Sequence, residues 1–125
     1  DCQRLLKQLD IKVHSLSQPV SELSGGNQQK VVFARALLAE AQVFLCDEPT
    51  QAIDVGARAE IHRLLRAQAS AGKAVLFVSS DLEETLEVCD RLVIMSSGRT
   101  VKVLENEHLS AEAVLACCYG EEARR

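Results

Sequence analysis

The residues with the clearest chemical potential in this 125-residue sequence lie in two short segments. The first runs from Leu23 through Ser24, Gly25 and Gly26 to Asn27 and precedes a strongly helical stretch. Small residues before a helix leave the first-turn N–H groups accessible, and the helix dipole adds partial positive charge there. Ser24 adds a hydroxyl donor, and the glycines let the backbone approach a ligand closely. The segment therefore predicts a site for a phosphate oxygen, with a simple serine cap and glycine turn as the alternative.

The second segment is an acidic pair, Asp47 and Glu48, which follows the apolar run 42–46. Such a run is typical of a buried strand, and the carboxyl end of a strand is where α/β sheets place ligands. In nucleotide hydrolysis the first carboxylate can hold Mg²⁺, and the second can polarise the attacking water. A solvated acidic turn without function is the alternative.

The elements that must position these segments alternate along the chain. Hydrophobic spacing predicts helices over 2–9, 27–40, 55–69, 82–89 and 111–119, a connector over 11–23, and strands over 42–46, 74–79, 92–96 and 100–104. This alternation is typical of an α/β fold with a mostly parallel sheet and an antiparallel C-terminal edge hairpin. Asp54 precedes one helix as a candidate N-cap, and Asp81 with Glu84 forms a candidate capping box.

Composition excludes several classes of protein. The 14 Lys and Arg against 18 Asp and Glu leave a net charge of −4, which argues against nucleic-acid binding. No apolar run approaches the roughly 20 residues that span a bilayer. The five cysteines lack the spacing of a zinc site or a disulfide framework, so reduced thiols in the cytosol are expected. Two groups are expected to be solvated: the histidines His14, His62 and His108, and the arginines Arg58, Arg63 and Arg66.

Taken together, LSGGNQQK and FLCDEPT resemble the signature and Walker B segments of the ATP-binding cassette (ABC) ATPases. Residues 52–54 stand where that family has its D-loop, and residues 78–81 where it has its switch loop. A finer resemblance is to the second cassette of the monosaccharide importers, in which two cassettes are fused in one polypeptide. It rests on Asn27, on residues 55–57 and on Ser80.

The resemblance implies ATP and Mg²⁺ as cofactors, and an opposing cassette and transmembrane permease subunits as partners. It also implies a peripheral place on the cytoplasmic face of the membrane. By this resemblance Ser24, Gly25 and Gly26 contact the γ-phosphate of ATP held by the opposing cassette. Asn27 and Asp54 are further nucleotide-binding residues, with Asp54 at the dimer seam, and Asp47 lies at Mg²⁺. The implied catalytic residues are Glu48 as general base and Ser80 at the switch position.

The sequence departs from the family pattern in two ways. A phosphate loop, G-x-x-x-x-G-K-[ST], is absent. The one Gly-Lys pair, Gly72-Lys73, has Ala67 in place of the first Gly of the motif and Ala74 in place of its Ser or Thr. The chain is therefore expected to be the C-terminal portion of a cassette, with an exposed apolar flank on its sheet. Residues 1–22 would end the helical subdomain and its connector, and 23–125 would run from the signature to the last helix.

The second departure is Ser80, which stands where most cassettes have a histidine. A serine hydroxyl is shorter than an imidazole and stays neutral. Catalysis by Glu48 is therefore in doubt, and Ser24, Gly25 and Gly26 are expected to carry the function of this chain. Two alternatives to a transport ATPase stay open: a non-hydrolysing coupling module, which Ser80 favours, and a DNA-repair or translation-factor ATPase, which should retain the switch histidine.

Overall fold

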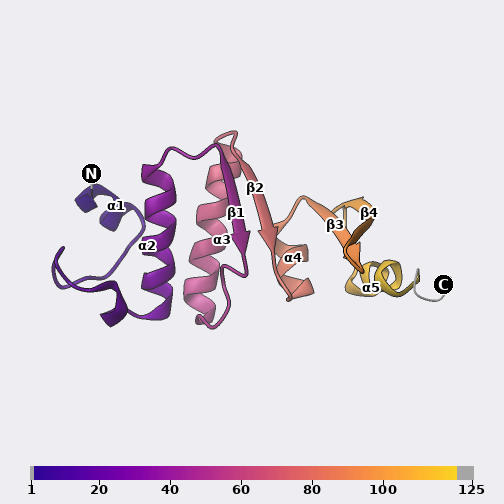
Figure 1. Cartoon of the computed structure of the whole chain (residues 1–125), viewed down its shortest axis with the longest axis horizontal. Coiled ribbons are helices and arrows are strands. Elements are labelled where there is room, and N and C mark those ends of the chain that lie inside the picture. The colour runs from indigo at the N-terminus through magenta and orange to yellow at the C-terminus, as the bar shows by residue number, and fades with distance from the viewer. Residues whose placement is uncertain (1, 121–125) are drawn as a thin grey trace. The chain divides into compact units, whose positions relative to one another are not determined.

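The computed structural model describes residues 2–120, and Figure 1 shows their helices and strands. The chain divides into two compact units between Val78 and Ser79. None of the helices within residues 2–120 is long and apolar enough to cross a membrane.

The first unit is built around a βαβ motif. Its elements are α1 (Cys2–Gln8), a 3₁₀ turn (Val20–Glu22), α2 (Gly25–Leu38), β1 (Val43–Asp47), α3 (Val55–Ser70) and β2 (Ala74–Val78). The two strands pair in parallel, with Val43 opposite Ala74 and Asp47 opposite Val78. A parallel pair needs a crossover connection, and α3 supplies it.

The core of this unit lies between the inner face of the strands and the helices. Figure 1 shows α2 and α3 on one side of the β1–β2 pair. The buried cluster consists of Leu9, Ile11, Phe33, Phe44, Ile61, Leu64 and Leu65. Phe33 of α2 and Phe44 of β1 stack with their ring centroids 5.6 Å apart. Because strand side chains alternate between faces, Phe44 and Cys46 turn inward while their neighbours turn outward.

The outer face of the same strands is apolar and exposed. Val43 and Leu45 of β1 lie beside Leu76 and Val78 of β2, and Leu45 is 76% exposed. Isolated exposed apolar residues are ordinary, but a contiguous group on one sheet face marks a surface that another segment covers. The apolar flank expected from the sequence is therefore present.

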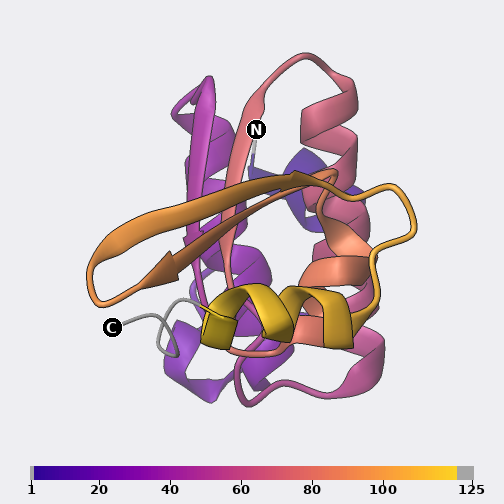
Figure 2. The ribbon, with the colours of Figure 1, turned by 90° about the vertical axis from the view of Figure 1, so that its right-hand side faces the viewer.

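The second unit is a helix-flanked hairpin. Its elements are α4 (Leu82–Val88), β3 (Arg91–Ser96), β4 (Arg99–Glu105) and α5 (Ala111–Gly120). Ser97 and Gly98 both take positive φ, as a two-residue hairpin loop requires. Figure 2 shows α5 lying beside the hairpin, and its Val114 packs with Leu92 and Ile94.

The structure confirms the α/β architecture and corrects several details. Helix α2 begins at Gly25 instead of residue 27, because the Ser24 side chain accepts the Asn27 N–H and so starts the helix directly after Ser24. Within residues 2–120 the antiparallel hairpin forms a two-stranded sheet of its own.

Two expectations about solvated side chains were wrong. His62 is 8% exposed and meets Phe77 edge-on, with 6.1 Å between ring centroids. It lies on the buried face of α3, beside Ile61 and Leu65. Arg58 is half-buried near the start of α3, whereas Arg63 and Arg66 are exposed as expected.

Candidate functional site

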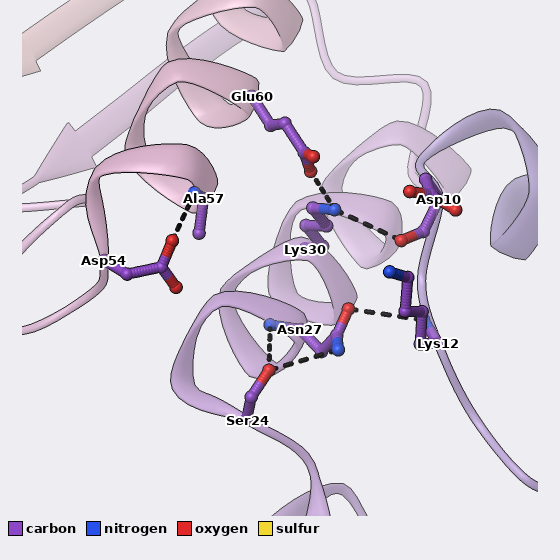
Figure 3. A network of polar contacts seen from close by, with 8 residues as sticks. All are labelled: Asp10, Lys12, Ser24, Asn27, Lys30, Asp54, Ala57 and Glu60. Carbon is purple, nitrogen blue, oxygen red and sulfur yellow. Dashed lines mark hydrogen bonds and ion pairs between the residues drawn. The ribbon is translucent and has the colours of Figure 1, made fainter.

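Ser24 caps the N-terminus of α2. Its Oγ accepts hydrogen bonds from the backbone N–H of Asn27 at 3.4 Å and from Asn27 Nδ2 at 3.1 Å (Figure 3). Gly25 and Gly26 form the first helical turn, where the helix itself supplies no acceptor for their N–H groups. Ser24 and Gly25 are exposed, so a hydroxyl and the positive end of a helix dipole face solvent together.

The two glycines have different surroundings. A Cβ on Gly26 would lie 2.5 Å from the Ala57 Cβ, so Gly26 lets α2 approach the start of α3. A Cβ on Gly25 would lie 3.7 Å from Ile53 Cγ2 and 3.8 Å from the Ala52 carbonyl oxygen, which is ordinary contact. Gly26 therefore serves the packing of α2 against α3, whereas no contact within residues 2–120 requires glycine at position 25.

Asp54 caps α3 beside the signature segment. Its Oδ1 accepts the Ala57 N–H at 2.9 Å, which confirms the predicted cap (Figure 3). Its Oδ2 lies 4.0 Å from the position a Gly26 Cβ would take. The structure thus brings the D-loop aspartate and the signature glycines together within the first unit. A role for Asp54 at a dimer seam stays a prediction.

An ion pair between a buried lysine and a partly exposed glutamate, which sequence reasoning missed, holds α2 against α3. Lys30 is 5% exposed, pairs with Glu60, and donates from Nζ to the Asp10 carbonyl oxygen at 3.1 Å (Figure 3). A signal was present in the sequence, because Gly26, Lys30 and Phe33 fall on one helix face at i, i+4 and i+7. A lysine on a buried face requires an acidic partner.

The acidic pair lies at the carboxyl end of β1, as predicted. Asp47 ends the strand and is exposed, on the same face as Leu45. Glu48 is half-buried with φ of 47°, in the left-handed region, and its N–H donates to the Val78 carbonyl at 2.8 Å. A left-handed non-glycine residue costs about 1–3 kcal/mol, so the surrounding turn holds Glu48 in a defined direction.

Gln29 connects this acidic turn to the signature helix. Its Nε2 donates to the Pro49 carbonyl at 2.7 Å, directly after Glu48. The signature helix and the acidic turn are therefore anchored to each other by one side chain. Sequence reasoning gave no role to Gln29.

Cys46 precedes the acidic pair and turns toward the core. Burial raises the pKa of its thiol, so the group stays neutral and packs as a small hydrophobe, as expected. Within residues 2–120, no three His, Cys, Asp or Glu side chains gather as a metal site.

Ser80 belongs to the second unit, where it is exposed and precedes α4. Asp81 accepts the Glu84 N–H at 3.1 Å, so the predicted cap is confirmed. The Glu84 carboxylate also accepts the Ser79 hydroxyl at 2.7 Å. The place of Ser80 at the switch position stays a prediction.

A shallow groove of about 250 Å³ runs along the free edge of β1 beside α2. Val32, Phe33, Val43 and Leu45 give it mostly apolar walls, with Gln29 and Asp47 among its polar lining residues. Apolar walls suit a covering segment of protein better than a triphosphate. The exposed helix N-terminus, where the sequence predicts a phosphate site, lies instead at Ser24 and Gly25.

Comparison with known proteins identifies the family. The ABC transporter family profile matches residues 1–51. An arabinose import ATP-binding protein of Azospirillum brasilense is 48% identical over 90% of this chain, and a ribose import ATP-binding protein of Streptomyces coelicolor is 47% identical over 91%. The chain spans 22% of the length of each of these curated relatives.

Solved structures agree on the fold. A dimeric ATP-binding cassette in a post-hydrolysis state, bound to ADP and phosphate, matches 86% of this chain and 46% of its own, with a TM-score of 0.71 and 26% identity. An ABC transporter in an inward-facing conformation matches 94% of this chain and 47% of its own, with a TM-score of 0.78 and 22% identity. The chain belongs to the ABC transporter family of ATP-binding proteins.

Proposed function

We propose that this chain is part of the ATP-binding subunit of an ABC importer for simple sugars, which couples ATP hydrolysis to transport. The names of its relatives, arabinose and ribose import ATP-binding proteins, support the substrate class. The observation that carries the proposal is the Ser24-capped start of α2, with Gly25 exposed and Asp54 beside it. This arrangement offers hydrogen-bond donors and partial positive charge to a phosphate group.

In the proposed mechanism, the signature segment acts on ATP held by an opposing cassette. The Ser24 hydroxyl and the Gly25 N–H donate to γ-phosphate oxygens, where charge accumulates during transfer. Gly26 and Asn27 support this arrangement from the first turn of α2. Asp54, held by its cap to Ala57, faces the seam between the cassettes and communicates between the two sites.

The acidic turn fits a Mg²⁺-nucleotide site. Asp47 offers one exposed carboxylate at a strand end, and Mg²⁺ is typically held by one or two carboxylates with water and phosphate oxygens. Bound Mg²⁺-ATP supplies the phosphoryl group that is transferred. Glu48 stands where the family has the base that accepts the proton of the attacking water. Because Ser80 at the switch position lacks the charge of a histidine, we expect this base to contribute little to turnover.

The exposed apolar surfaces support further partners. We infer that the face made by Val43, Leu45, Leu76 and Val78 is covered by the phosphate-loop part of the cassette. Residues 1–22 would end the helical subdomain, and residues 23–125 would carry the signature, the acidic turn, the switch loop and the C-terminal hairpin. Transmembrane permease subunits would hold the complete ATP-binding subunit at the cytoplasmic face of the membrane. Nucleic acid is not expected as a partner.

Glu48→Gln in the complete transporter is expected to lower ATP turnover less than tenfold. A base contributes only when water, phosphate and switch residue are placed together, and Ser80 lacks the reach and charge of a histidine. The measurement is steady-state ATPase of the assembled transporter at saturating Mg-ATP. If Glu48→Gln abolishes turnover as fully as a variant of the signature segment does, Glu48 is the working base. The proposal that the signature segment contributes more to turnover than Glu48 would then be wrong.

The 125-residue chain alone is expected to bind ATP with a Kd in the millimolar range or higher. This corresponds to a binding free energy of about −4 kcal/mol or a less favourable value. Its sequence offers carboxylates and one helix N-terminus but no phosphate loop. Isothermal titration of the chain with Mg-ATP measures this directly. Micromolar affinity would mean that the chain contains a nucleotide-binding site that the proposal does not include, and the prediction would be wrong.

Ser80 also favours a second candidate, a cassette-derived module that couples or regulates and takes part in no ATP hydrolysis. The same ATPase assay separates the two. Under the coupling reading, Ser24 and Gly25 variants lose no turnover, because the signature segment faces no working site.

A further inference from the structure

We propose that Asn27 is a positioning residue that fixes the Ser24 hydroxyl as a hydrogen-bond donor to the nucleotide. This inference rests on the proposed function of the signature segment and assigns Asn27 a role different from direct nucleotide binding. It starts from the polar network around the start of α2 (Figure 3).

Asn27 fills the acceptor positions of the Ser24 hydroxyl. Asn27 donates to Ser24 Oγ twice, from its backbone N–H at 3.4 Å and from Nδ2 at 3.1 Å. A hydroxyl oxygen has two lone pairs and one proton. With both acceptor positions in use, the proton of Ser24 must point to an acceptor elsewhere, and Ser24 is exposed. A phosphate oxygen is such an acceptor.

The orientation of the Asn27 amide follows from its other contact. Its Oδ1 accepts the backbone N–H of Lys12 at 3.3 Å. A backbone N–H can only donate, so the oxygen of the amide must face Lys12 and the nitrogen must face Ser24. Asn27 is also half-buried, which limits its other rotamers. The backbone of residue 12 therefore sets the direction of the Ser24 proton through one side chain.

The neighbouring ion pair keeps that anchor in place. Lys30 reaches the Asp10 carbonyl and Glu60 from the next turn of the same helix face. The segment that carries Lys12 is thus bound to α2 at two points, by Asn27 and by Lys30. Because Lys30 still binds the segment of Lys12 to α2 when the Asn27 side chain is lost, α2 should stay in place. The loss should therefore change the orientation of the Ser24 hydroxyl more than the stability of the helix.

A double-mutant cycle in the complete transporter tests the inference. We expect Ser24→Ala to lower kcat for ATP about thirtyfold and Asn27→Ala about tenfold, with KM for Mg-ATP within twofold of wild type. In the Ser24→Ala background, Asn27→Ala should add less than twofold, because a positioning residue has no effect once its target is absent. Asn27→Asp, which is isosteric but accepts where Nδ2 donates, should be at least as impaired as Asn27→Ala.

Two further variants separate positioning from general stability. Asn27→Gln keeps the amide and should recover turnover to within threefold of wild type. Gln28→Ala, which removes the neighbouring amide that donates to the Leu23 carbonyl at 2.8 Å, should keep kcat within twofold. Wild-type kcat in Asn27→Ala, or a full tenfold loss that persists in the Ser24→Ala background, would overturn the inference. Wild-type kcat in Ser24→Ala would instead overturn the proposed function on which it rests.

Discussion

Gly25→Asp in the complete transporter is expected to lower ATP turnover about 100-fold, which corresponds to roughly 2.7 kcal/mol of transition-state stabilisation. The new side chain lies at an exposed position at the N-terminus of α2, where the helix dipole would otherwise favour a phosphate group. A carboxylate there repels the phosphate and occupies the space that a ligand needs. Turnover is measured at saturating Mg-ATP in the assembled transporter.

Matched variants at the same position separate charge from size. A Cβ on Gly25 meets Ile53 at an ordinary 3.7 Å, so Gly25→Ala and Gly25→Asn should both fold normally. Gly25→Asn has the size of the aspartate without its charge and should retain more turnover than Gly25→Asp. Near-normal ATPase in Gly25→Asp would mean that Ser24, Gly25 and Gly26 face no working site.

The sequence predicted the elements well because their hydrophobic periods are strong and their ends are marked. Asp54, Asp81 and Ser24 each precede a helix, and each accepts a hydrogen bond from the first turn. The start of α2 was placed two residues late because glycines weaken helix propensity. The Ser24 cap overrides that weakness locally.

The misses share a physical cause, which is that burial depends on partners distant in sequence. His62 is polar by type, but its place on α3 turns it toward Phe77 fifteen residues away. Lys30 is buried because Glu60 and the Asp10 carbonyl lie beside it, at separations of 30 and 20 residues. Residue type predicts that a lysine is exposed, and only the contact between α2 and α3 makes this one an exception.

For the candidate site, the sequence identified which residues have the right chemistry but not which of them act through others. The family resemblance alone placed Asn27 with the glycines as a nucleotide-binding residue. Its bonds to Ser24 and to Lys12 indicate a different role, and no periodicity could reveal them because they cross a turn and a connector. The same holds for Gln29, whose bond to the Pro49 carbonyl links two motifs that the sequence treats separately.

Gly26→Ala is expected to destabilise the protein by about 1–3 kcal/mol, the usual cost of adding a methyl group to a closely packed contact. Its Cβ would lie 2.5 Å from the Ala57 Cβ, so α2 and α3 must move apart. The free energy of unfolding, from urea denaturation of the intact polypeptide, measures the effect. Gly25→Ala is the matched control and should be neutral or slightly stabilising, since its Cβ has room and the helix favours alanine.

Ala57→Gly provides the decisive comparison, because it removes the atom that the new methyl group meets. The double variant Gly26→Ala with Ala57→Gly should recover about half or more of the lost stability, although glycine in the first turn of α3 costs up to ~1 kcal/mol. ATP turnover should follow the same order, since the contact between Gly26 and Ala57 sets the distance from the signature segment to Asp54. Equal stability of Gly26→Ala and Gly25→Ala would show that the two helices are not in close contact at this point, and the division of roles between the glycines would then fail.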